Sequence, residues 1–287
     1  MSFYSIPPLE DKKHSKSKKH EDDVYAVTGF SQTRNGISFI ENNFSADVIY
    51  REDLSEKKIR YKVSDLKQSC EGLIFQFAQC FNEFTADLEL QINEGFEVTG
   101  ILNHKEIIQK WEAERTRLKE KFKSIPDVEE LLNNYENSVK NEEKLRNSIF
   151  YTGIAQIFFP RIKQLLQAPI EQKKFMRKRF LHGFYFGLKI PVKEELTIRT
   201  SDQLFIANLD AVLDIESIEN GEEFIRAFKM LYGDKIEMDD ITFHAKEKYE
   251  LSGALECITG EIDQYFEVRG VHFKKDKISY KKTGDER

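Results

Sequence analysis

Hydrophobic residues recur at the spacing of an α-helix through the middle of the chain, from about residue 104 to residue 179. In the first part of this stretch, successive apolar residues lie three, four or seven positions apart and so share one helical face: Ile107, Trp111, Leu118, Phe122 and Ile125. Pro126 suits the first turn of a helix but not its interior, so a second helix is expected to begin there. The pattern predicts a series of helices in the middle of the chain.

Residues 149–159 form the most apolar part of this stretch, and they carry no charge. A helix that is apolar nearly all round is expected to be buried on several sides. The run is far shorter than the roughly 20 residues that a membrane-spanning helix needs. We therefore predict that residues 149–159 form the core of the whole protein.

Alternating apolar and polar residues predict strands on both sides of the helical stretch, at about 24–102 and 180–282. Asn35 and Gly36 lie between two β-prone runs and predict a hairpin turn, because both residue types tolerate positive φ. A helix is expected at about 64–83, with Ser64 as its cap. In the second flank, Gly221 opens a short helix that Gly233 ends, and three or four antiparallel strands follow.

Together these patterns predict an α+β fold in which antiparallel sheet regions, about 24–102 and 180–282, pack on a central helical layer, about 104–179. Residues 1–22 are almost wholly polar and charged after the first few positions, which predicts a flexible arm. The remainder is expected to form two α+β regions, residues 23–179 and 180–287, that either pack on the same helices as one domain or form two.

The composition argues against several classes of function. The chain has 287 residues and a formal net charge of −6, which argues against a general nucleic-acid binder with a basic face. Its 3 cysteines form no CxxC pair, so neither a disulfide framework nor a zinc site is expected. No apolar run like that of a signal peptide occurs in residues 1–23, which predicts a cytoplasmic location without membrane insertion. The abundance of Lys, Ile, Asn, Glu and Phe suggests AT-rich coding and a bacterial source.

Two groups of residues are candidates for binding. The strongest basic cluster could hold a phosphate, a nucleic acid or an acidic protein face, or could simply favour the end of a helix: Lys173, Lys174, Arg177, Lys178 and Arg179. Phenylalanine occurs 23 times, and some of these rings could line an apolar pocket instead of packing in the core: Phe158, Phe159, Phe180, Phe184 and Phe186.

The sequence contains only weak signals for a metal-binding or catalytic site. An acidic group resembles a loose divalent-ion loop but lacks the alternation and closing glutamate of a calcium site, so a solvated loop is expected: Asp234, Glu237, Asp239 and Asp240. No nucleotide-binding, hydrolase or metalloprotease motif is present, so no cofactor or metal is expected.

These observations favour a non-enzymatic cytoplasmic protein that binds another protein, of the immunity, chaperone or secretion-adaptor type. The alternative is a carrier of a small apolar ligand in a cavity between sheet and helix. An enzyme is the third hypothesis, and it requires histidines or acids that converge in one cleft. The sequence predicts no oligomeric state.

Overall fold

The computed structural model describes residues 22–94, 97–150, 154–158, 174–185, 188–201, 204–218, 220–252 and 256–283. Eleven strands within these ranges form one sheet: β1 Asp23–Asn35, β2 Ser38–Asp53, β3 Lys58–Gln68, β4 Asp87–Ile92, β5 Val98–Ile101, β6 Lys174–Tyr185, β7 Leu188–Ser201, β8 Leu204–Leu213, β9 Ile241–Ser252, β10 Cys257–Val268 and β11 His272–Thr283. The helices are α1 Leu73–Phe84, α2 His104–Lys121, α3 Val128–Val139, α4 Glu142–Phe150, α5 Ala155–Phe158 and α7 Gly221–Tyr232, with short 3₁₀ turns η1 Ile215–Ser217 and η2 Met238–Asp240.

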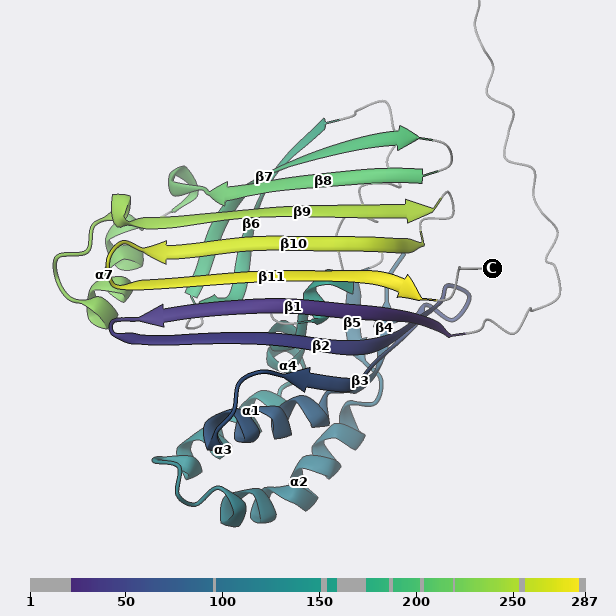
Figure 1. Cartoon of the computed structure of the whole chain (residues 1–287), viewed down its shortest axis with the longest axis horizontal. Helices are drawn as coiled ribbons and strands as arrows, with labels where there is room; N and C mark the ends of the chain where they lie inside the picture. The colour runs from purple at the N-terminus through teal and green to yellow at the C-terminus, as the bar shows by residue number, and fades with distance from the viewer. Residues whose placement is uncertain are drawn as a thin grey trace, which may run out of the picture.

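The strand order is β5-β4-β3-β2-β1-β11-β10-β9-β8-β7-β6, and every neighbouring pair is antiparallel. The first and last strands of the chain meet in the middle of this order, where Val24 pairs with Thr283 and Asn35 with His272. The two strand-rich flanks therefore belong to one sheet (Figure 1). The fold is α+β, with a large antiparallel sheet as its main element.

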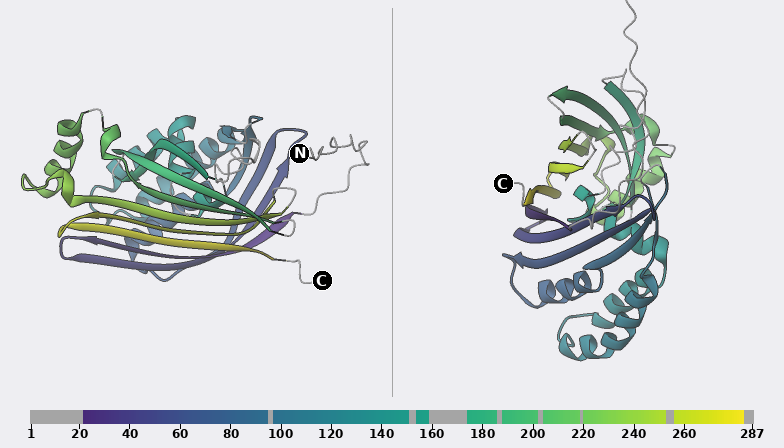
Figure 2. Two further views of the ribbon diagram at one scale, coloured as in Figure 1. Left: turned by 90° about the horizontal axis from the view of Figure 1, so that it is seen from above. Right: turned by 90° about the vertical axis from the view of Figure 1, so that its right-hand side faces the viewer.

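The sheet is strongly curved, and its inner face forms a trough (Figure 2). Helices α1, α2 and α3 lie beside the β3 side of the sheet (Figure 1). Helix α4 contacts both β5 and β6, the strands at the two ends of the order, whereas α5 contacts β10 and β11 near the middle. Helix α4 therefore lies near both edges of the sheet, and helix α5 lies near its middle strands.

Helix α4 also protects the β5 edge. The Ile101 backbone N–H donates to Glu142 Oε1 at 2.8 Å, and Arg146 donates from Nη1 to the Thr99 carbonyl at 2.8 Å. An edge strand exposes unpaired backbone groups that can recruit another chain. Side chains of α4 satisfy two of those groups on β5.

Phe158 belongs to the hydrophobic core and is 2% exposed. Four tyrosine rings surround it with centroid distances of 5.2, 5.8, 5.8 and 4.8 Å: Tyr25, Tyr50, Tyr61 and Tyr280. Ala155 and Ile157 are also buried, and Ile149 is half-buried. The prediction of a buried core at residues 149–159 is confirmed for Ala155, Ile157 and Phe158, while residues 151–153 and 159 lie outside the described part of the chain.

Several local predictions are confirmed. Gly36 has φ 57° in the turn between β1 and β2. Helix α7 begins at Gly221 and ends before Gly233, which has φ 101°, and Asn220 caps it by accepting from the Glu223 backbone N–H at 3.1 Å. No helix within the described residues combines the length and apolar character that crossing a membrane requires.

Two predicted helices are wrong in extent. The helix expected at about 64–83 begins only at Leu73, because β3 continues to Gln68 and pairs with β2. The helical stretch expected to reach residue 179 also ends earlier, because Lys174–Tyr185 is strand β6. In both places pairing with a neighbouring strand outweighs the local helical spacing, and Glu194 and Glu195 on β7 supply partners for the basic residues of β6.

The predicted charged arm, residues 1–22, lies outside the described residues except for Asp22. The division into regions 23–179 and 180–287 stays a prediction, although strands from both regions pair in the one sheet.

Candidate binding pocket

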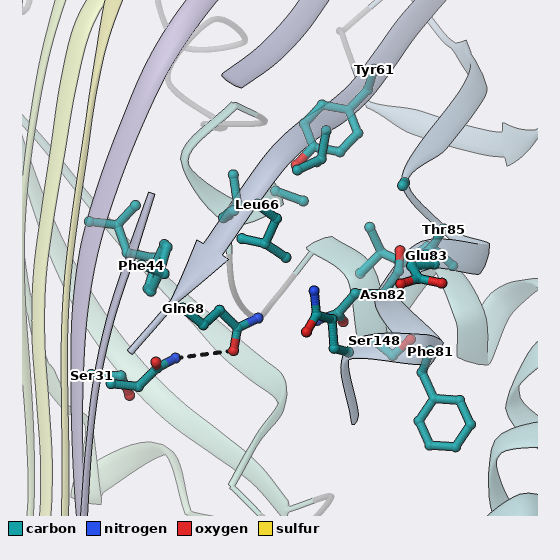
Figure 3. Close-up of a pocket in the computed structure, with 18 of the residues that line it drawn as sticks. Ser31, Phe44, Tyr61, Leu66, Gln68, Phe81, Asn82, Glu83, Thr85 and Ser148 are labelled. Atoms are coloured by element: carbon teal, nitrogen blue, oxygen red, sulfur yellow. Dashed lines mark hydrogen bonds between the residues drawn. The ribbon is translucent and has the colours of Figure 1, made fainter. Parts of the chain in front are cut away.

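A cavity of about 770 Å³ lies between the sheet and the helices. One wall is formed by the inner face of β1, β2, β3 and β11, and the other by residues of α1, α3, α4 and α5 (Figure 3). Its described lining is mixed, with apolar residues such as Phe44, Leu66 and Ile278 beside polar residues such as Asn42 and Gln68.

Glycine shapes the sheet wall of the cavity. Gly29 on β1 pairs with Phe44 on β2, and the Phe44 ring occupies the space that a Cβ on Gly29 would need. The ring can therefore lie against the neighbouring strand instead of standing upright into the cavity. Gly29 thus helps to keep the cavity open.

The floor of the cavity contains the nearly buried Asp276, whose side chain accepts hydrogen bonds from two neighbouring strands. Ser31 Oγ donates to Oδ1 at 2.6 Å, and Gln264 Nε2 donates to Oδ2 at 3.2 Å. Lys274 Nζ lies 3.3 Å from Oδ2. A buried carboxylate is stable only when it is paired and hydrogen-bonded, and these three partners provide both.

Amide and hydroxyl groups extend the polar surface across the cavity. Asn42 Nδ2 donates to Gln68 Oε1 at 3.5 Å, and Asn42 Oδ1 accepts from the Cys70 backbone N–H at 3.2 Å. Asn82 of α1 and Ser148 of α4 lie on the opposite wall, facing Gln68 (Figure 3). Such neutral groups can donate to and accept from a ligand without a charge of their own.

A β-bulge in β3 brings consecutive residues to the cavity. Ser45 pairs with Lys67 and Asp47 with Ser64, so Asp65 and Leu66 together face a single residue of β2. Asp65 adopts φ 51°, in the left-handed region that few residues other than Gly, Asn and Asp enter cheaply. Side chains alternate in a regular strand, but here Ser64, Asp65 and Leu66 all line the cavity.

Behind the helical wall lies the only tryptophan of the chain, Trp111, which is buried. Its ring centroid is 4.9 Å from that of Tyr135 and 6.1 Å from that of Phe81, and both of these residues line the cavity. Tyr135 stacks on Phe81 at 4.1 Å and donates from its hydroxyl to the Phe81 carbonyl at 3.1 Å. Burial raises the pKa of Tyr135 well above its usual value, so this hydroxyl stays a donor. Trp111 therefore contacts two rings that line the cavity, although it does not line the cavity itself.

The described cavity lining contains hydrogen-bonding groups and four charged side chains, but no histidine or cysteine. Throughout the described part of the chain, no group of three or more His, Cys, Asp or Glu residues is placed to hold a metal ion. The lining therefore offers hydrogen-bond donors and acceptors, charged groups and apolar surface.

Three members of the predicted basic cluster, Lys174, Arg177 and Lys178, lie on β6 and do not line this cavity. Lys174 Nζ is 2.8 Å from Glu195 Oε1, Arg177 pairs with the buried Glu194, and Lys178 Nζ is 3.1 Å from Asp214 Oδ2. A hydrogen bond from Ser217 and the pairing with Lys178 lower the pKa of Asp214. Each of these three cations already has an acidic partner within the fold.

The described structure does not place the other predicted site residues at the cavity. Phe180 is 44% exposed on β6, and Phe158 lies in the tyrosine cluster. Arg179 and Phe184 belong to β6, but their side chains are not described, and Lys173, Phe159 and Phe186 lie outside the described residues. A binding role for these residues stays a prediction.

The sequence suggested a cavity between sheet and helix, but it did not identify the residues that line this one. Its residues come from strands and helices far apart in the chain, and none belongs to a recognisable motif. One faint signal existed, because Ser31 and Asp276 interrupt the apolar side of otherwise alternating strands.

Comparisons of the chain with protein-family models, with curated proteins and with solved structures find no match. Its function is therefore inferred from the geometry of the chain itself.

Proposed function

We propose that this protein binds a small amphiphilic molecule in the cavity between β1, β2, β3, β11 and the helices. The observation that supports this most directly is the cavity of about 770 Å³ with its mixed lining. Small-molecule sites typically enclose about 300–1,000 Å³ and combine apolar walls with a few fixed polar groups. This proposal refines the hypothesis of a carrier for an apolar ligand, because the polar lining calls for a polar part in the ligand.

The two kinds of wall would act on different parts of such a ligand. Phe44, Leu66 and Ile278 offer apolar surface, and removing apolar area from water contributes about 25 cal/mol per Å². Asn42, Gln68 and Asn82 offer donors and acceptors that would fix its orientation. We also propose that the helices between residues 104 and 158 act as the layer that closes the sheet, and that the role is binding in the cytoplasm without catalysis.

The test is a titration with N-phenyl-1-naphthylamine, a neutral amphiphilic dye that fluoresces in apolar surroundings. Wild-type protein is expected to bind it in a saturable manner and to change the emission of Trp111. Ser148→Phe should block the cavity and weaken binding at least about tenfold, because Ser148 lies in the cavity lining and a phenylalanine ring there would fill space that the dye needs.

Lys144→Phe is the matched control, because it puts the same ring on an exposed position of α4 that does not line the cavity. Its affinity for the dye should equal that of the wild type. Equal affinity of Ser148→Phe and wild type, or no saturable binding at all, would contradict the proposed function. Circular dichroism of both variants checks that they fold.

A second candidate, binding to another protein, is favoured by the tip of the β1–β2 hairpin. Ile37 is fully exposed there, and Phe39 and Ile40 are 55% and 44% exposed. The ring centroid of Phe39 lies 6.3 Å from that of Phe273, so the apolar surface extends onto β11. Clustered exposed apolar residues are typical of interaction sites.

This second proposal is tested by cross-linking in the native host and comparing wild type with an Ile37→Ser, Ile40→Ser double variant. A specific partner should be lost from the double variant. A cross-linked partner that both proteins retain equally would place the contact elsewhere.

A further inference from the structure

Acidic side chains outnumber basic ones in the described lining of the cavity. There are four of them: Asp65, Glu83, Lys274 and Asp276. Lys274 and Asp276 pair with each other on the floor, with 3.3 Å between Nζ and Oδ2. The carboxylates of Asp65 and Glu83 remain, and among the described residues neither of them forms an ion pair.

Asp65 and Glu83 lie on adjoining segments, and both line the cavity. Lys62 of β3 pairs with Asp87 of β4, and the Val63 backbone N–H donates to the Ala86 carbonyl at 2.7 Å. The chain runs in opposite directions on the two sides of this ladder, so its continuation carries Asp65 toward Glu83. Both side chains are exposed, and we name this pair the acidic rim.

Helix α1 adds negative potential at the same place. Glu83 belongs to the last turn of α1, which contains no basic residue. The carboxyl end of a helix carries a partial negative charge that usually attracts Lys, Arg or His side chains. Here an acidic residue occupies that position beside the cavity, and the bulge directs a second acidic residue toward the same cavity.

We propose that the ligand of this cavity is an organic cation, with an apolar body inside and an ammonium or similar group at the acidic rim; this rests on the proposed function. An anionic headgroup at the rim would meet two carboxylates and the carboxyl end of α1. A cationic headgroup would find there two carboxylates that form no ion pair within the described part of the chain. The polar floor stays internally neutral through Lys274 and Asp276 and does not select charge.

The experiment uses two probes with the same ten-carbon alkyl chain, decyltrimethylammonium and undecanoate, below their micelle concentrations. Each competes with N-phenyl-1-naphthylamine on the full chain. Wild type is expected to bind the cation about tenfold more tightly than the anion, since two exposed carboxylates each contribute modestly and act in the same direction. Raising the salt concentration should reduce this preference.

The variant that tests the rim is Asp65→Asn with Glu83→Gln. Asparagine tolerates the left-handed backbone at position 65 as aspartate does, so the charge is removed without changing the bulge. The preference for the cation, measured as the ratio of the two competitors' affinities, should fall to about threefold or less. Asp210→Asn with Glu222→Gln removes the same charge at exposed positions outside the cavity lining and should leave the preference unchanged.

The outcomes separate the two proposals. Saturable dye binding with equal or tighter displacement by undecanoate overturns the cation inference and leaves the proposed function standing. The cation inference is also overturned if the rim variant keeps the full preference for the cation. Absence of dye binding by the wild type overturns both.

Discussion

Gly260 lies opposite Tyr280 in the β10–β11 ladder, and the Tyr280 ring fills the space that a side chain on Gly260 would occupy. Tyr249, the β9 partner of Gly260, would come within 3.1 Å of the same Cβ through its Cδ1 atom. Two tyrosine rings therefore converge over one glycine. This position joins the middle strands of the sheet to the aromatic cluster around Phe158.

Gly260→Ala should lower the free energy of unfolding by about 1–3 kcal/mol, because an added methyl group in a packed interior forces rings and backbone to move. Urea denaturation measures this. Gly221→Ala is the control, since its Cβ would meet only Met238 Cε at 3.7 Å and alanine suits the first turn of α7. If Gly260→Ala is as stable as the control, the rings do not occupy the position described.

Phe158→Ala should be among the most destabilising substitutions in the chain, at about 3–5 kcal/mol. It removes the ring that Tyr25, Tyr61 and Tyr280 contact, and it leaves a cavity next to β11. Phe39→Ala, on an exposed ring, should change the free energy of unfolding by less than about 1 kcal/mol. Similar effects of the two substitutions in chemical denaturation would refute the central position of Phe158.

Asp65→Val should destabilise the protein by about 1–2 kcal/mol, because a β-branched residue is strained at φ 51°. Asp65→Asn should leave the stability within about 0.5 kcal/mol, since asparagine tolerates this conformation. Comparing the two thermal unfolding midpoints separates backbone strain from loss of charge. A stable Asp65→Val protein would mean that β3 can do without the bulge.

His272 should make stability depend on pH. Burial, and secondarily the charge of Lys274, lowers the pKa of His272 to about 4 from its usual 6.5. The neutral ring packs against Tyr232 of α7 and Phe266 of β10. Because the folded-state pKa is depressed, this stabilising contribution is fully present above about pH 6.5 and is lost as the pH falls from 6.5 toward 4.

The expected loss is up to about 3 kcal/mol, at 1.36 kcal/mol for each pKa unit. Urea unfolding at pH 7, 5.5 and 4 measures it. In His272→Gln the part of the slope between pH 6.5 and 4 that belongs to this residue should disappear, whereas the exposed His244→Gln should retain it. If the free energy of unfolding of His272→Gln depends on pH as that of the wild type does, protonation of His272 does not destabilise the folded protein.

Features set by short-range signals were predictable from the sequence. The Asn35–Gly36 turn, the start and end of α7, and the apolar face of α2 each depend on residues a few positions apart. Position-specific backbone freedom and one-sided hydrophobic spacing act locally, so the amino-acid order alone fixes them. Burial of Ile157 and Phe158 followed in the same way from an uncharged run.

Only the tertiary structure decided which strands pair and what the inner face encloses. The residues around Lys178 have the charge expected at a helix end, but pairing of β6 with β7 makes them a strand with acidic neighbours. Val24 and Thr283 become partners in one sheet although nearly the whole chain separates them. The cavity depends on this pairing of β1 with β11, because its walls come from segments that are far apart in the sequence. It also depends on the bulge at Asp65, which turns consecutive residues of β3 toward it. Long-range pairing of this kind leaves little local signal in the sequence, so the residues that line the cavity and form its acidic rim were identified only in the folded chain.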